Sequence, residues 1–190
     1  MTNDRGWIQT YTGKRFWPLS PERGEICIED IAWALSNMPR FAGHASRFYS
    51  VAEHSLTVSR HCPVGLKLAG LLHDASEAYL CDIPSPVKYH EEFGFYRDIE
   101  AHLQARINNV FRIGFINAMN RTEIKRWDNI VTAAEADRLM QPLDSELAEW
   151  IDSILKSVPK IPFVGVCSAD PKYFNSRFLN EYRDLRNQGV

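Results

Sequence analysis

The sequence lacks any uninterrupted apolar run of about 18 residues, the length that a transmembrane helix needs. Residues 1–17 also lack an apolar segment of signal-peptide length. The formal net charge is only −2, so the protein as a whole has no general attraction for duplex nucleic acid. These absences predict a cytoplasmic protein that neither spans a membrane nor binds duplex nucleic acid. Any phosphate-bearing ligand would need a local cluster of cations.

Cysteine pairs of the CxxC type are also missing, because Cys27, Cys62, Cys81 and Cys167 lie far apart in the sequence. This spacing argues against a disulfide framework and predicts four reduced core residues. No internal repeat, low-complexity tract or linker divides the chain. With 190 residues, 45% of them hydrophobic and 24% charged, the chain has an ordinary globular composition. A single domain over residues 1–190 is therefore expected.

The spacing of apolar residues predicts an all-α protein with a small N-terminal β-hairpin. The hairpin is expected around residues 8–17, with its turn at Gly13. Helices are expected over residues 27–37, 50–62, 65–80, 91–111, 121–140, 144–157 and 175–187. Residues 38–50 are expected to form a loop, residues 83–88 are too rich in proline to be helical, and residues 159–167 are expected to be extended.

Polar residues with metal-binding side chains lie on two consecutive predicted helices. On a helix over residues 65–80, His73, Asp74 and Glu77 fall within one arc of about 100°, which alone would indicate a solvated polar face. His54 shares the apolar side of the preceding helix with Val58, so its ring points where the core should be. A hydrogen-bonded core histidine is the alternative reading. Together, two histidines and an aspartate supply ligands that suit zinc, manganese, iron or cobalt.

A further carboxylate would be needed to complete such a site. On the helix predicted over residues 121–140, Asp128 lies on the inward stripe with Val131, whereas Asp137 projects to the other side. The alternative for Asp128 is a surface carboxylate paired with Lys125 or Arg126, and the spacing does not separate these two readings.

The order His54, then His73-Asp74, then a distant aspartate resembles the H…HD…D pattern of the HD-domain metal-dependent phosphohydrolases. The segments RFAGHASRFYSVAEHS, LLHDASEAYLCDIPSPVK and WDNIVTAAEADRLM are similar to successive blocks of the small 5′-deoxynucleotidases and dATP triphosphohydrolases of that superfamily. The resemblance runs from about Trp7 to Met140. It implies one HD domain, an all-helical bundle that holds its metal in the interior.

The resemblance also implies a metal-ligand set. The ligands would be His54, His73, Asp74 and Asp128, holding a divalent transition metal such as zinc, manganese, cobalt or iron, with magnesium as a further option. In the last block WDNI replaces the more usual alanine-aspartate pair, which leaves Asp137 as a rival ligand.

Further site residues follow from the same resemblance. Glu77 and Asp82 match acidic residues that orient or protonate reacting groups near the metal. Arg40 and Lys88 match phosphate or sugar contacts, and Arg47 is a third candidate cation. For Arg47 and Lys88 the alternative is an ordinary surface cation.

Three functions are compatible with these residues. The leading hypothesis is hydrolysis of a nucleotide phosphate, most of all a deoxynucleoside monophosphate or triphosphate, by a homo-oligomeric enzyme. A phosphodiesterase that acts on a cyclic or linear dinucleotide would use the same chemistry. A nucleotide-sensing module without turnover belongs to a different class, and the presence of Glu77 and Asp82 beside the metal residues argues against it.

Overall fold

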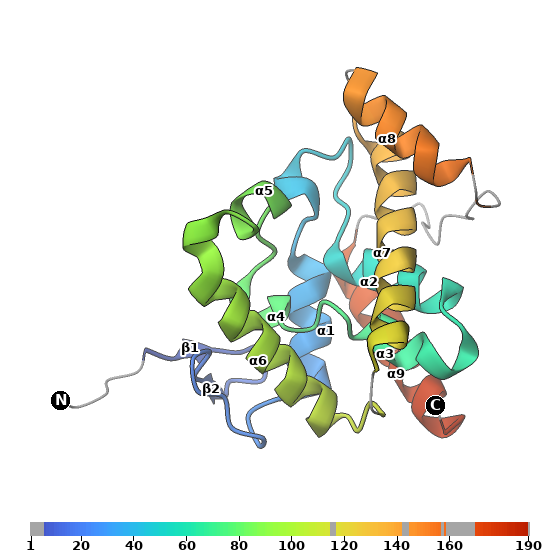
Figure 1. Ribbon diagram of the computed structural model, residues 1–190. Helices are drawn as coiled ribbons and strands as arrows, with labels where there is room; N and C mark the ends of the chain where they lie inside the picture. Colours follow the sequence, from blue (N-terminus) through green and yellow to red (C-terminus); the bar gives the residue numbers. More distant parts are fainter. Residues whose placement is uncertain (1–5, 115–116, 142–144, 157, 159–169, 190) are drawn as a thin grey trace.

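A short hairpin precedes a bundle of helices in the computed structural model, which describes residues 6–114, 117–141, 145–156, 158 and 170–189 (Figure 1). Strands β1 (Ile8–Gln9) and β2 (Arg15–Phe16) are antiparallel. The turn between them passes through Gly13 at φ 81°, a conformation that glycine adopts without strain. The prediction of a mainly helical fold with an N-terminal hairpin is confirmed.

Helix α2 (Val51–His61) lies at the centre of the bundle and packs against α1 (Ile28–Asn37), α3 (Lys67–Leu71), α7 (Ala118–Leu139) and α9 (Pro171–Asn187). It begins at Ser50, whose hydroxyl accepts a hydrogen bond from the Glu53 backbone N–H at 3.1 Å. It ends just before Pro63, which cannot continue a helix. Nine of its residues are buried, so any polar side chain on α2 needs an internal partner.

The helix predicted over residues 65–80 is interrupted. The 3-10 turn η2 (Val64–Leu66) leads into α3, residues 72–76 form a tight turn, and α4 (Glu77–Leu80) follows. The prediction of one continuous helix was wrong because side chains take backbone acceptors that the helix would use. His73 Nδ1 lies 2.8 Å from the Gly70 carbonyl oxygen, and Gln104 Nε2 donates to the Leu72 carbonyl oxygen at 2.8 Å.

Residues 83–88 also differ from expectation, because Ser85–Lys88 form the short helix α5. Its proline lies in the first turn, where the missing N–H has no intrahelical partner to lose. The 3-10 turn η3 (Glu91–Phe93) and helix α6 (Gly94–Val110) follow. Figure 1 shows α6 and α7 on opposite sides of the central helices. Only Leu103 and Ile107 of α6 are buried, so this helix presents mainly polar side chains.

The C-terminal helices match their predictions with shifted ends. Helix α8 (Ser145–Leu155) packs on α7, and α9 begins before the predicted position because Asp170 caps it through the backbone N–H of Lys172 at 2.9 Å. The extended segment predicted over residues 159–167 lies outside the described residues. Among the helices that are described, none combines the length and apolar character that a membrane crossing requires.

The cysteine prediction holds only in part. The thiols of Cys27, Cys62 and Cys81 are all reduced. Cys62 is a buried core residue, whereas Cys27 is half-buried and Cys81 is exposed. The prediction that all are core residues was therefore wrong for Cys27, whose thiol contacts Asp30 at the start of α1, and for Cys81, which ends α4 at the surface. Cys167 is outside the described residues.

Candidate metal centre

Four candidate ligands from three parts of the chain meet in the interior. His54 comes from α2, His73 and Asp74 come from the turn after α3, and Asp128 comes from α7. The Nε2 atom of His54 lies 3.1 Å from Oδ1 of Asp128, and Nε2 of His73 lies 3.1 Å from Oδ2 of Asp74. Ligand atoms of His54, His73 and Asp74 all lie within 4.8 Å of one another, so this group could hold a metal ion.

The ring nitrogens of both histidines are arranged for metal binding. His54 Nδ1 lies 2.9 Å from Glu135 Oε1, and His73 Nδ1 lies 2.8 Å from the Gly70 carbonyl oxygen, so each Nδ1 carries the proton and donates. In the neutral form of each ring, the Nε2 atom then presents a lone pair. Both are buried and make no hydrogen bond, which is rare for buried polar atoms. Two bare nitrogens facing two carboxylates fit a divalent metal.

Glu135 is a site residue to which the sequence reasoning assigned no role. Its side chain is 1% exposed, and its Oε1 accepts hydrogen bonds from His54 Nδ1 and from the Tyr49 hydroxyl at 2.7 Å. Burial raises the pKa of Glu135, but the charges of His54 and Arg40 outweigh it and the pKa is lowered. The residue therefore stays ionised and orients the His54 ring. Its position two turns after Asp128 on the same inward stripe was the signal that could have identified it.

Replacing Glu135 by glutamine tests this orienting role. We expect the affinity for Mn²⁺ or Co²⁺ to fall about 10–100-fold, since outer partners of metal-binding histidines typically contribute that much. Isothermal titration of metal-free protein measures the change. The exposed Glu149→Gln on α8 serves as control, and an unchanged affinity in Glu135→Gln would show that the contact does not support a ligand.

The two rival aspartates lie in different environments. Asp128 is 8% exposed and faces His54, while Asp137 is exposed on the other side of α7. The Lys125 ammonium contacts Oδ2 of Asp128, so the pairing considered from the sequence is present together with the inward position. The geometry thus brings Asp128, and not Asp137, to the histidines.

Asparagine at each position separates these two residues experimentally. We expect Asp128→Asn to lower metal affinity about tenfold or more, because a negative charge that offsets the cation is lost. Asp137→Asn should bind metal like the wild type. Metal titration of both variants is the measurement, and the reverse pattern would mean that the fourth ligand has been misassigned.

The histidines and carboxylates of this centre shift one another's pKa strongly. Burial lowers the pKa of His73, but Asp74 and Asp128 outweigh it and hold that pKa well above its usual value. Although burial alone would raise it, the pKa of Asp74 falls to about 2 because of His73. The metal-free histidines therefore hold protons that a metal must displace, so metal binding weakens as the pH falls.

Glu77 is the first residue of α4 and follows the candidate ligand Asp74 by three residues. Its side chain is buried, and its Oε2 atom has no hydrogen-bond partner among the described residues. Burial, followed by the charges of Asp74 and Asp82, raises the pKa of Glu77 to about 9. The ammonium of Lys88, 3.7 Å from Oε1, only partly offsets this. In the metal-free protein Glu77 is a neutral acid at pH 7.

This raised pKa predicts a pH-dependent stability. An unfolded chain releases the Glu77 proton near the ordinary pKa of 4.5, whereas the folded, metal-free protein retains it up to about 9. Within that window the unfolded state binds fewer protons, so the free energy of unfolding falls as the pH rises. Glu77→Gln should therefore raise the stability of metal-free protein by about 2 kcal/mol or more near pH 8, and by much less near pH 5. Thermal melts at both pH values measure this, and a gain independent of pH would contradict it.

The remaining predicted site residues are brought to the centre unequally. Arg40 Nη1 lies 3.9 Å from Asp74 Oδ2, and its Nη2 donates to Thr132 Oγ1 at 2.9 Å, so it holds the centre together. Asp82 is half-buried, and burial raises its pKa while Arg40 lowers it. Arg47 instead forms an ion pair of 2.7 Å with the buried Glu53. This buried carboxylate pairs with the Arg47 guanidinium, and a phosphate contact by Arg47 stays a prediction.

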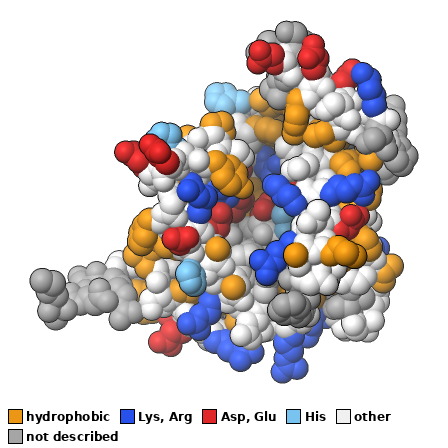
Figure 2. Space-filling view, in the orientation of Figure 1, with side chains coloured by type: hydrophobic (Ala, Val, Ile, Leu, Met, Phe, Trp, Pro, Cys, Tyr) orange, Lys and Arg blue, Asp and Glu red, His pale blue; other side chains and the backbone are white. Residues whose placement is uncertain are grey.

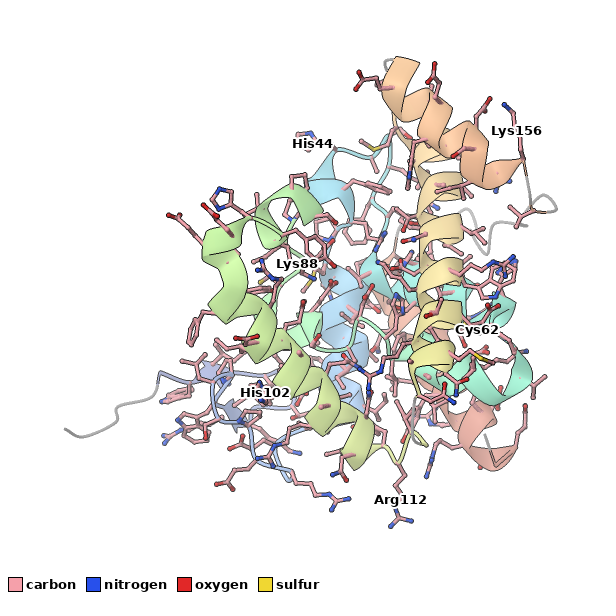
Figure 3. All side chains as sticks on the ribbon, viewed as in Figure 1. His44, Cys62, Lys88, His102, Arg112 and Lys156 are labelled. Atoms are coloured by element: carbon pink, nitrogen blue, oxygen red, sulfur yellow. The ribbon has the colours of Figure 1, made fainter. Side chains whose placement is uncertain are left out.

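Lys88 and the other outlying candidates complete this comparison. The Lys88 ammonium lies 2.7 Å from Glu100 Oε1 on α6 and faces a cleft beside the centre (Figure 3). His44 is exposed at the outer edge of the molecule, away from the ligands. Lys88 thus lines the cleft as part of an ion pair with Glu100, whereas His44 is not placed to bind the metal.

A cleft of about 960 Å³ opens from the metal centre toward the surface between α6 and α7. His73, Asp74 and Asp128 lie at its inner end. Figure 2 shows acidic and histidine side chains within this hollow and cationic side chains around it. The cations that line it are Arg23, Lys88, Arg97, Arg112, Arg121 and Lys125, against three acidic residues, Asp74, Glu100 and Asp128. A cleft of this size and charge suits an anionic small molecule.

Comparison with known proteins finds two full-length relatives. The chain is 35% identical over 179 residues to "Uncharacterized protein YfdR" of Escherichia coli K12, a match that covers 94% of this chain and 95% of that protein. It is 32% identical over 178 residues to an uncharacterized protein of Rhodobacter capsulatus, covering 83% of this chain and 90% of that protein. No protein-family model matches the chain. Both matches cover more than four fifths of this chain.

Proposed function

This chain belongs to the family of the Escherichia coli protein YfdR, and from that premise and the site geometry we propose that it is an HD-domain phosphohydrolase that hydrolyses nucleotide phosphates with a divalent metal. One observation carries the proposal. The bare Nε2 atoms of His54 and His73 meet the carboxylates of Asp74 and Asp128 at the inner end of a cleft lined with cations.

The arrangement addresses the two obstacles to phosphate ester hydrolysis. These esters are anionic and repel nucleophiles, and water is a poor nucleophile at neutral pH. A bound divalent metal supplies a water of lowered pKa, roughly 7, together with positive charge for the phosphoryl oxygens. The ligand set of two histidines and two carboxylates suits zinc, manganese, cobalt or iron, and magnesium is a further candidate. Metal analysis of protein purified without chelator identifies the ion.

The chain's own residues supply the proton transfers and the binding. Glu77 is buried beside the centre, where burial raises its pKa in the metal-free protein, so it is placed to give a proton to the leaving-group oxygen. Asp82 belongs to the same charge cluster and serves as the second acid or base. Lys88 and Lys125 line the cleft and bind phosphate oxygens, while Arg40 lies 3.9 Å from Asp74 and orients it.

The favoured substrates are deoxynucleoside monophosphates or triphosphates, which fit the volume and charge of the cleft. Because such nucleotides are intracellular, we also propose a cytoplasmic location. A homo-oligomeric state is a further part of the proposal, and light scattering coupled to size-exclusion chromatography tests it. The buried acidic side chain of Glu77 beside the ligands favours turnover over nucleotide sensing alone.

A product-resolved screen tests this function. Metal-free protein is loaded separately with each candidate metal and incubated with dNMPs, NMPs, dNTPs and cyclic dinucleotides. We expect metal-dependent release of inorganic phosphate from monophosphates or of triphosphate from dNTPs. Cleavage of the dinucleotides alone would favour a phosphodiesterase, and binding without any hydrolysis would favour a sensing module.

A further inference from the structure

The turn that carries His73 and Asp74 is bounded by two backbone groups that an uninterrupted α-helix would pair with each other. In such a helix the N–H of Ser76 would donate to the carbonyl oxygen of Leu72, four residues earlier. Here the side chain of Gln104 lies between them. Its Oε1 accepts from the Ser76 N–H at 3.1 Å, and its Nε2 donates to the Leu72 carbonyl oxygen at 2.8 Å.

The amide of Gln104 is well suited to this position. The Leu72 carbonyl oxygen, which also accepts from the Ala75 N–H at 3.2 Å, has a second acceptor position, and Ser76 offers a donor, so a single side chain can bridge both only if it carries a donor and an acceptor of its own. The second N–H of the amide is also used, because it donates to Oδ1 of Asn108 at 2.9 Å, one turn further along α6. The Gln104 side chain is therefore held in one orientation by three hydrogen bonds.

The same face of α6 holds the rest of the segment that bears the site residues. The Tyr96 hydroxyl donates to the Cys81 carbonyl oxygen at 3.0 Å, and Arg97 Nη1 donates to the Lys88 carbonyl oxygen at 2.7 Å. Glu100 pairs with the Lys88 ammonium. These contacts hold the first half of α6 against the segment. Gln104 is therefore fixed by them on its N-terminal side and by Asn108 on its C-terminal side.

The turn allows the adjacent side chains of His73 and Asp74 to approach each other. Nε2 of His73 lies 3.1 Å from Oδ2 of Asp74, and the ring is fixed through the Gly70 carbonyl oxygen. In a regular helix that carbonyl would accept from the Asp74 N–H, and adjacent side chains would diverge by about 100°. We propose that Gln104 is a positioning residue that holds the helix open between Leu72 and Ser76, so that His73 and Asp74 bind the same metal ion. This inference rests on the metal centre of the proposed function.

The variant Gln104→Met keeps the length of the side chain and removes both hydrogen-bonding functions. We expect its Co²⁺ affinity to fall about tenfold or more, as for other residues that orient metal ligands, and the visible spectrum of bound Co²⁺ to change. Arg106→Leu, an exposed change on the same helix and outside the cleft, should leave both unaltered. A purely structural role for Gln104 would lower the melting temperature and leave affinity and spectrum unchanged in the folded protein.

Hydrogen exchange provides a second measurement that needs no metal. The Ser76 amide should exchange faster in Gln104→Met than in wild type. If that variant does not fold, Asn108→Ala can be used instead. It removes one of the three hydrogen bonds of the Gln104 amide and should lower the Co²⁺ affinity by a smaller factor. Wild-type Co²⁺ affinity and spectrum in both Gln104→Met and Asn108→Ala would overturn the inference alone. A wild-type protein that binds no Co²⁺ would overturn the proposed function as well.

Discussion

Replacing His73 by alanine is expected to remove the transition metal from the protein. Its Nε2 atom is buried, has no hydrogen-bond partner and lies among two carboxylates and a second imidazole, so no nearby group can substitute for it. Sites with four protein ligands bind zinc with about 10–16 kcal/mol, or roughly 3 kcal/mol per ligand. The loss of one ligand then weakens binding about 100-fold. Elemental analysis of protein purified without chelator, followed by Co²⁺ titration, measures this loss.

The control for this variant is another histidine on the surface. His102 is exposed on α6, where its Nδ1 lies 2.7 Å from the Asp98 carbonyl oxygen (Figure 3). His102→Ala should keep its metal. Full metal occupancy and hydrolysis in His73→Ala would show that the ligand assignment is wrong, whatever the behaviour of the other candidates.

Glu77→Gln is expected to keep its metal and to lose most turnover. Glutamine preserves the shape of the buried side chain but has no acidic proton to give. General acid–base catalysis is typically worth about 10²–10⁴-fold in rate, and we expect kcat to fall within that range. Steady-state kinetics on the best substrate of the screen, together with a Co²⁺ titration, measure both parts of this prediction.

The kinetic parameters also distinguish the roles open to Glu77. A raised KM with unchanged kcat would mark it as a residue that binds substrate uniformly, in contradiction to proton transfer. Glu92→Gln, an exposed change in η3, is the matched control and should leave kcat and metal content unchanged.

Local patterns in the sequence were sufficient to find the ligand candidates. His54 and Asp128 each interrupt an apolar stripe at helical spacing, and both side chains are buried as that spacing predicted. The hairpin was predicted because Gly13 supplies the positive φ of its turn. These features depend on neighbours within a few residues, which is the range over which a sequence pattern carries structural information.

Features that depend on distant partners could not be predicted in this way. The helix break at His73 involves Gln104, which follows Ser76 by 28 residues. No pattern in the sequence near either residue predicts that contact. Arg47 and Lys88 looked alike as candidate cations, yet the fold pairs Arg47 with the buried Glu53 and Lys88 with Glu100 in the cleft lining. The role of each charged residue was decided by which counter-charge the fold placed beside it.

The central claim is that metal held by His54, His73, Asp74 and Asp128 is required for nucleotide hydrolysis. A titration of metal-free protein with Co²⁺ tests it most directly when bound metal and the hydrolysis of deoxynucleoside monophosphates and triphosphates are followed in the same samples. We predict that hydrolysis rises in proportion to bound metal in the wild type and that His73→Ala shows neither at the Co²⁺ concentrations that saturate the wild type. Hydrolysis at the full rate by metal-free protein, or none by fully loaded protein, would contradict the account.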